Sequence, residues 1–158
     1  MSKEHLSTYL NDHLAGSNLA VEILDHLTSE TPSLSSSLTA LRVEIEEDRE
    51  HLKSLMAKQH IEESRVRKAS GWIAEGLAEL KLEVDDDAKG RLRRLERLEA
   101  LAIAIDGKIA LWHALNAAAR TNAELGGIDY ERLSQRGQDQ RARVETLRLQ
   151  AAHEALAA

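Results

Sequence analysis

Apolar residues recur along much of the chain at alternating spacings of three and four positions. This spacing places them in a row along one face of an α-helix. Four such rows predict four long helices, over about residues 2–30, 34–59, 88–120 and 129–157. Since an α-helix rises about 1.5 Å per residue, each would be roughly 40 Å long. The pattern therefore predicts an all-α protein, with residues 1–158 forming a single four-helix-bundle domain.

Polar or small residues interrupt several of these rows. The rows consist of Leu6, Leu10, His13, Ser17, Ala20, Leu24 and Leu27; Leu34, Leu38, Leu41, Ile45, Asp48, Leu52 and Leu55; Leu95, Leu98, Ala102, Ile105, Ile109 and Trp112; and Leu133, Gly137, Gln140, Val144, Leu147 and Ala151. A polar group that is buried has to find a hydrogen-bonding partner. The polar members of the rows are therefore the first candidates for a functional site.

Two of the three connections between the helices are short. The first contains Pro32, which disfavours the α conformation of the residue before it. The last contains "ELGG" at residues 124–127, where a glycine can provide the left-handed C-cap of the third helix. Short connections make consecutive helices antiparallel neighbours.

The connection between the second and third helices is long. It spans about 30 residues and can therefore cross the whole length of the bundle. We expect a short extra helix within it. Its inward-facing residues would be Trp72, Ile73, Leu77 and Leu80.

Composition narrows the classes of function. Aromatic residues make up 3% of the chain, which is low for a β-rich fold. The absence of cysteine excludes disulfides, thiolate catalysis and iron–sulfur clusters. The net charge of −6 argues against nucleic acid as a partner. No apolar run reaches the ~20 residues of a membrane span, and the N-terminus lacks the features of a secretory signal. We expect a cytoplasmic protein that does not bind membranes.

Counting outward from the two short turns shows which residues lie at the same level of the bundle. His13 falls opposite His51, and Ser17 falls opposite Asp48. Asp106 falls near Arg143 in the second pair of helices. The expected polar layer at the centre of the bundle consists of His13, Asp48, His51, Asp106, Gln140 and Arg143.

Three stretches, "YLNDHLAGSNLAVEILDHL", "EIEEDREHLKSLM" and "IDGKIALWHAL", resemble small bacterial proteins of the ferritin-like superfamily whose function is uncharacterised. The resemblance implies two antiparallel helix pairs joined by one long crossover. It also implies a di-metal centre, in which two helices each contribute a Glu and the other two each contribute Glu-x-x-His.

The chain matches this metal-binding set only in part. Asp48 and His51 have the Glu-x-x-His spacing with Asp in place of Glu. The corresponding stretch of the fourth helix, "SQRGQDQRARVETL", contains no His. The first helix has His13 and Ser17 where a Glu would be expected.

Three interpretations of the polar layer remain open. In the first, His13, Asp48, His51 and Asp106 bind one divalent ion of iron, manganese or zinc, although the positive charge of Arg143 opposes it. In the second, no cofactor is bound, and Arg143 bridges Asp48 and Asp106 as a structural ion pair. In the third, the helix faces are shifted from those assigned, and most of these side chains are partly solvated.

The sequence favours a non-catalytic structural or binding protein. No P-loop, G-x-S-x-G, H-E-x-x-H or dinucleotide fingerprint is present, so no catalytic or cofactor-binding residue is assigned. Self-association of the helices into a homo-oligomer is the expected mode of interaction. One alternative is a metalloprotein with a reduced mononuclear or dinuclear site and oxidoreductase or metal-handling activity. Another is a small-ligand binder using the space around Gly16, Ser17 and Gly137.

Overall fold

The structure, a computed structural model, describes residues 3–64 and 90–157. These residues form four long helices and contain no strand, which confirms the predicted all-helical architecture. The helices are α1 (Lys3–Glu30), α2 (Ser35–Lys58), α4 (Arg91–Ala119) and α5 (Tyr130–Leu156), with short 3-10 turns η1 (Pro32–Leu34) and η3 (Ala123–Leu125). The predicted short helix containing Trp72 lies outside the described residues. No described helix combines the length and apolarity that a membrane span requires.

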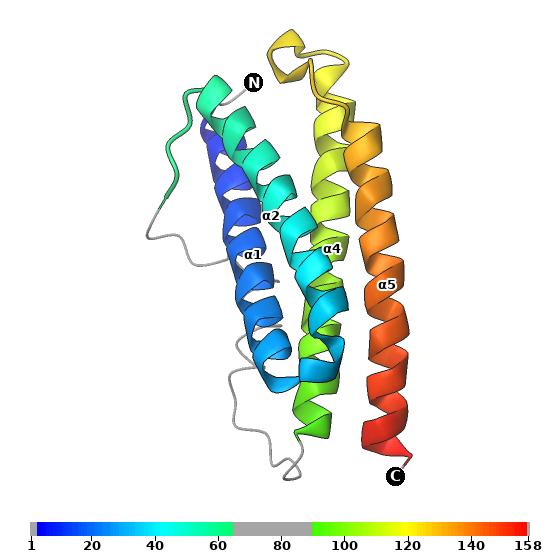
Figure 1. Ribbon diagram of the computed structural model, residues 1–158. Helices are drawn as coiled ribbons and strands as arrows, with labels where there is room; N and C mark the ends of the chain where they lie inside the picture. Colours follow the sequence, from blue (N-terminus) through cyan, green and yellow to red (C-terminus); the bar gives the residue numbers. More distant parts are fainter. Residues whose placement is uncertain (1–2, 65–89, 158) are drawn as a thin grey trace.

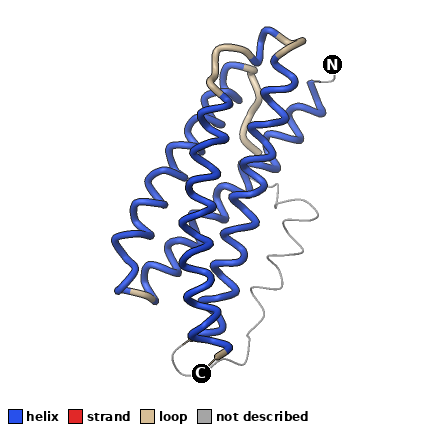
Figure 2. The backbone as a smooth tube through the Cα atoms, turned by 90° about the vertical axis from the view of Figure 1, so that its right-hand side faces the viewer, coloured by secondary structure: helices blue, strands red, loops and turns tan. Residues whose placement is uncertain are grey.

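The four helices run side by side along one long axis (Figures 1 and 2). Helix α1 is antiparallel to α2, and α4 is antiparallel to α5, as the two short connections predict. Helices α2 and α4 run in the same direction (Figure 1). The end of α2 and the start of α4 therefore lie at opposite ends of the bundle.

Local sequence explains where α5 begins. Asp129 caps it, because its side chain accepts a hydrogen bond from the Arg132 backbone N–H at 3.0 Å. The Tyr130 hydroxyl donates to the Leu125 carbonyl at 2.7 Å, which fixes η3 against the start of this helix.

The predicted glycine C-cap of the third helix is wrong: α4 ends at Ala119, before η3. Gly127, with φ of +88°, follows η3 instead.

Every residue of the four predicted rows is buried or half-buried. The buried apolar side chains form two clusters, one at each end of the bundle. The first includes Leu24, Leu38, Leu98, Leu101 and Val144. The second includes Leu10, Leu55, Trp112, Leu125 and Tyr130. Asp48 lies between the two clusters along α2, and Gln140 lies between them along α5. Polar groups therefore separate the two apolar clusters.

Gly137 allows α4 and α5 to approach closely. A Cβ atom added at this position would lie 2.7 Å from Cγ1 of Ile109 on α4, which is shorter than any ordinary contact. At this position the small row residue therefore serves close helix packing and not the lining of a ligand cavity.

We expect Gly137→Ala to destabilise the protein by about 1–2 kcal/mol, because the cost of overpacking exceeds the ~1 kcal/mol that alanine gains in helix propensity. Urea unfolding measures this difference. The same substitution in an Ile109→Ala background should cost nothing, since the colliding atom is gone. Gln138→Ala on the exposed face of α5 is the control and should change stability by less than ~0.5 kcal/mol. A Gly137→Ala protein more stable than the wild type would contradict the close approach.

Candidate functional site

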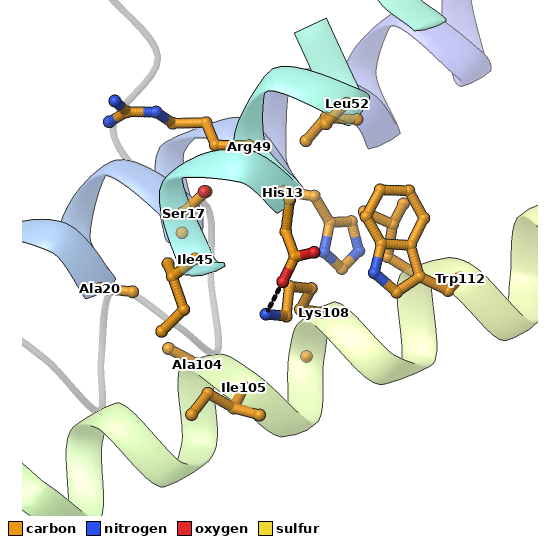
Figure 3. A pocket seen from close by; sticks show the side chains of 14 residues that line it. His13, Ser17, Ala20, Ile45, Arg49, Leu52, Ala104, Ile105, Lys108 and Trp112 are labelled. Carbon is orange, nitrogen blue, oxygen red and sulfur yellow. Dashed lines mark hydrogen bonds and ion pairs between the residues drawn. The ribbon is translucent and has the colours of Figure 1, made fainter. Parts of the chain in front are cut away.

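A buried ion pair occupies the centre of the bundle. Nζ of Lys108 on α4 lies 2.5 Å from Oδ2 of Asp48 on α2 (Figure 3). The same ammonium group donates a hydrogen bond to Oε1 of Gln140 on α5. The side chain of Asp48 is 0% exposed and that of Lys108 is 12% exposed. One cation thus connects three of the four helices in a region from which water is largely excluded.

The carboxylate of Asp48 has two further partners, both on α5. Nε2 of Gln140 donates to Oδ2 at 3.1 Å. Nε of Arg136 lies 3.5 Å from Oδ1, close enough for an ion pair but without the geometry of a hydrogen bond. A buried carboxylate is tolerated only when its charge is compensated. Asp48 meets this requirement through Lys108, Gln140 and Arg136.

Burial lowers the pKa of Lys108, because the charged ammonium is taken out of water. The neighbouring charge of Asp48 and its hydrogen bond oppose this shift and favour the ammonium form. Both groups that accept from Nζ are oxygens, as an ammonium requires. The contact with Asp48 therefore opposes the loss of the ammonium proton that burial favours.

A ladder of polar contacts joins α2 to α5 outside the ion pair. Arg136 donates to the Glu44 carbonyl at 2.7 Å and to the Glu47 carboxylate at 2.6 Å. Arg143 is bonded to the Glu44 carboxylate. Burial alone would raise the pKa of Glu44, but hydrogen bonds from Arg143 and Gln140 lower it overall. Long side chains therefore hold α5 to α2 at this level.

The structure brings some of the predicted layer together. Asp48 and Gln140 are buried and in contact, and both lie in the predicted rows. The predicted bridge from Arg143 to Asp48 and Asp106 is wrong. Arg143 is bonded to Glu44, and the exposed Asp106 is paired with Arg141 at 3.3 Å. Asp106 has the predicted height but lies on the outer face of α4.

Lys108 is the site residue that sequence reasoning missed. It lies in the apolar stretch "EALAIAIDGKIALW", and neither the predicted rows nor the expected polar layer included it. Its spacing was nevertheless informative, because Lys108 lies three positions after Ile105 and three before Leu111, both buried. That is the spacing of residues on one face of a helix. Lys108 is two positions after Asp106, so its side chain points to the opposite side of α4.

The predicted metal ligands do not form one cluster. His51 is exposed on α2, whereas His13 is half-buried, with its ring centroid 4.6 Å from that of Tyr9. Within residues 3–64 and 90–157, no three His, Asp or Glu side chains are placed to hold a metal ion. The donors around Asp48 include two cations, Lys108 and Arg136. This set does not fit the di-metal centre that the ferritin-like resemblance implies, and no metal chemistry is derived from it.

A small pocket lies between α1, α2 and α4, beside the ion pair. Its cavity volume is about 30 Å³. Small residues from α1 and α4 create this space, and apolar side chains form much of the remaining wall. The small residues are Gly16, Ser17, Ala20, Ala104 and Gly107. The polar residues that line it are His13, Asp48, Arg49 and Lys108. The pocket therefore places charged groups at the edge of an otherwise apolar space.

Trp112 carries a hydrogen-bond donor without a partner. The residue is 1% exposed, and its Nε1–H donates to no described protein atom. Figure 3 shows the indole nitrogen on the side of the ring that faces Lys108 and His13. A buried donor left unsatisfied costs about 1–3 kcal/mol. This donor faces the pocket and is available to a molecule inside it.

Comparison of the chain with protein-family models, with curated proteins and with solved structures finds no match. The resemblance to the ferritin-like superfamily therefore stays a prediction. Function has to be argued from the geometry of this site.

We expect Lys108→Met to destabilise the protein by about 3–5 kcal/mol, because it leaves the Asp48 carboxylate buried without its closest cation. The double variant Lys108→Met/Asp48→Leu should recover most of that loss, since no buried charge remains. Arg143→Leu is the control. Its ion pair with Glu44 is exposed, at 42% and 31%, and should contribute less than ~1 kcal/mol. Equal losses for Lys108→Met and Arg143→Leu in urea unfolding would contradict the central role of Lys108.

A second prediction concerns pH. Burial lowers the pKa of His13 below its usual 6.5, an effect that Asp12 partly opposes. When the pH falls below the pKa that His13 has in the unfolded chain, the unfolded chain binds a proton. The folded protein binds this proton only at a lower pH. His13 should therefore contribute stability above pH ~6.5 that is lost on acidification.

The variant His13→Gln should lose less stability than the wild type between pH 7 and pH 5. His51→Gln, on the exposed face of α2, should follow the wild type. Thermal unfolding across this pH range measures both. Identical pH profiles for His13→Gln and the wild type would contradict the burial of a neutral imidazole.

Proposed function

We propose that this chain is a divergent ferritin-like four-helix bundle that serves as a non-catalytic structural or binding protein. In this proposal, the ammonium group of Lys108 takes the central position that metal ions hold in the family's di-metal proteins. The observation that carries the proposal is the contact of Lys108 with Asp48 and Gln140, which links α2, α4 and α5 at the middle of the bundle.

The direction of the helices supports the ferritin-like assignment. The pairs α1–α2 and α4–α5 are antiparallel, and α2 runs in the same direction as α4 (Figure 1). This arrangement requires one long crossover between the second and third long helices, which is the topology of ferritin-like bundles. Bundles built from short connections alone would alternate in direction throughout.

The balance of charge supports a centre without metal. In a di-metal bundle, inward carboxylates neutralise the metal ions. Here the carboxylates nearest the centre are already paired with fixed cations: Asp48 with Lys108, Glu47 with Arg136, and Glu44 with Arg143. A divalent ion at this position would be repelled by the ammonium and guanidinium groups.

The same pairing argues against catalysis by the central residues. Lys108 is bonded to two oxygens, and Asp48 is enclosed by Lys108, Gln140 and Arg136. A general base or a nucleophile has to reach its substrate with a free proton-accepting or electron-donating atom. The paired groups stabilise one another instead, which suits a scaffold or a binding protein.

Metal analysis tests this proposal. Untagged protein is produced in medium supplemented with iron, manganese and zinc, and its metal content is measured by mass spectrometry. We expect far less than one metal ion per chain in the wild type and in the variant Asp48→Ala/His51→Ala. Addition of a chelator should leave the melting temperature unchanged, because no folded-state ligand is removed.

Near-stoichiometric metal that disappears in Asp48→Ala/His51→Ala would overturn the proposal. It would favour the alternative metalloprotein, with a reduced iron, manganese or zinc site and oxidoreductase or metal-handling activity. Lys108→Met/Asp48→Leu provides a control for folding, because it removes the buried pair without leaving an unpaired charge.

A further inference from the structure

We infer that the pocket between α1, α2 and α4 binds a one- or two-carbon carboxylate, formate or acetate, whose oxygens accept hydrogen bonds from Trp112 Nε1 and Lys108 Nζ. This inference rests on the binding role in the proposed function and names its class of ligand. It depends on the pocket and on two donors, and not on the family resemblance.

The two donors project into the same space. Lys108 and Trp112 are four residues apart on α4, so they lie on one face of that helix, and both line the pocket. Trp112 Nε1–H has no described partner. The ammonium group of Lys108 has three hydrogens, two of which serve Asp48 and Gln140. One indole donor and one ammonium hydrogen therefore remain for a ligand, and a carboxylate supplies two acceptor oxygens.

The charges around the pocket favour an anion. One cation, Lys108, and one carboxylate, Asp48, face it, whereas the guanidinium of the lining residue Arg49 extends away from the pocket and is bonded to Asn18 and Glu46 (Figure 3). The outer oxygen of Asp48 faces Arg136 of α5, which compensates that carboxylate from the side away from the pocket. Burial lowers the pKa of His13, which favours the neutral imidazole, and this form adds no charge and can donate one hydrogen bond and accept another.

The size of the cavity restricts the ligand. A cavity volume of about 30 Å³ leaves room for a molecule of a few non-hydrogen atoms. Formate has three non-hydrogen atoms and acetate has four, so these carboxylates approach that limit. The methyl group of acetate would face the apolar wall formed by Ile45, Leu52 and Leu111.

The indole N–H of Trp112 is a direct probe of the pocket. The chain has two tryptophans, so a Trp72→Phe background leaves a single indole resonance in the ¹⁵N–¹H spectrum. The protein is titrated with formate and with acetate against sodium chloride of equal ionic strength. We expect a saturable shift of the Trp112 indole proton, with a Kd on the order of 1 mM, within the affinity that so few atoms can provide.

Two variants test the geometry. Trp112→Phe keeps an aromatic ring but removes the donor, and should weaken binding about tenfold when binding is followed on ¹³C-labelled formate. Ser17→Leu fills the pocket from α1 and should abolish the indole shift. Ser54→Leu places the same side chain on the exposed face of α2 and should leave binding unchanged. Circular dichroism confirms that each variant is folded before its binding is interpreted.

Several results would overturn the inference. The first is the absence of a saturable shift up to roughly 50 mM carboxylate, which is well beyond the expected Kd. The second is an equal shift with ethanol or with butyrate. The third is an unchanged affinity for formate in Trp112→Phe. Each of them would show that the pocket does not select a one- or two-carbon carboxylate through these two donors.

The titration is repeated in the presence of a chelator. A shift that persists supports carboxylate binding by Lys108 and Trp112. A shift that disappears shows that a metal ion holds the carboxylate, which overturns the inference. Metal in the wild type together with a chelator-resistant shift would overturn only the proposed metal-free centre. The two proposals therefore fail separately.

Discussion

The rest of the bundle depends on one buried ion pair, between Lys108 of α4 and Asp48 of α2. Each group would be costly to bury alone, and each is tolerated because the other lies beside it. The pair separates the two apolar clusters and fixes the height of α2 relative to α4. Gln140 adds α5 to the same contact through one bond to each partner. A slip of one residue along any of these helices would separate buried charges, so the polar centre specifies the register that leucine packing alone leaves less well defined.

The same pair determines what the centre can bind. A carboxylate layer without a fixed cation attracts metal ions, whereas this layer contains its own cation. Within the described part of the chain the N–H of Trp112 has no partner, so a donor remains on the pocket side. The lysine at the centre thus bears on both the expected cofactor and the expected class of ligand.

The sequence predicted the helices well because the row of apolar residues along each helix follows directly from its period. It also predicted that Asp48 and Gln140 face inward, because both lie within such rows. Counting from the turns gave the level of each residue along the bundle but not the face of the helix on which it lies. Asp106 was therefore predicted in the central layer, although its side chain points away from it. Lys108 was not predicted, because it lies outside the row of apolar residues that was predicted for its helix. The choice of partner by Arg143 could not be predicted, since a long side chain reaches several carboxylates and only the packed geometry selects Glu44.

The contact between α2 and α5 differs in kind from the contact between α4 and α5. At Gly137 the backbone of α5 approaches α4 directly, and their apolar side chains interlock. Helix α2 reaches α5 at the same level through Arg136, Gln140 and Arg143, with carboxylates on the other side. Salt screens such exposed pairs, whereas it does not weaken apolar contacts. Among the described helices, the contact between α2 and α5 should therefore weaken with salt more than the contact between α4 and α5, and local opening along it would hydrate the central lysine while α4 and α5 remain packed together.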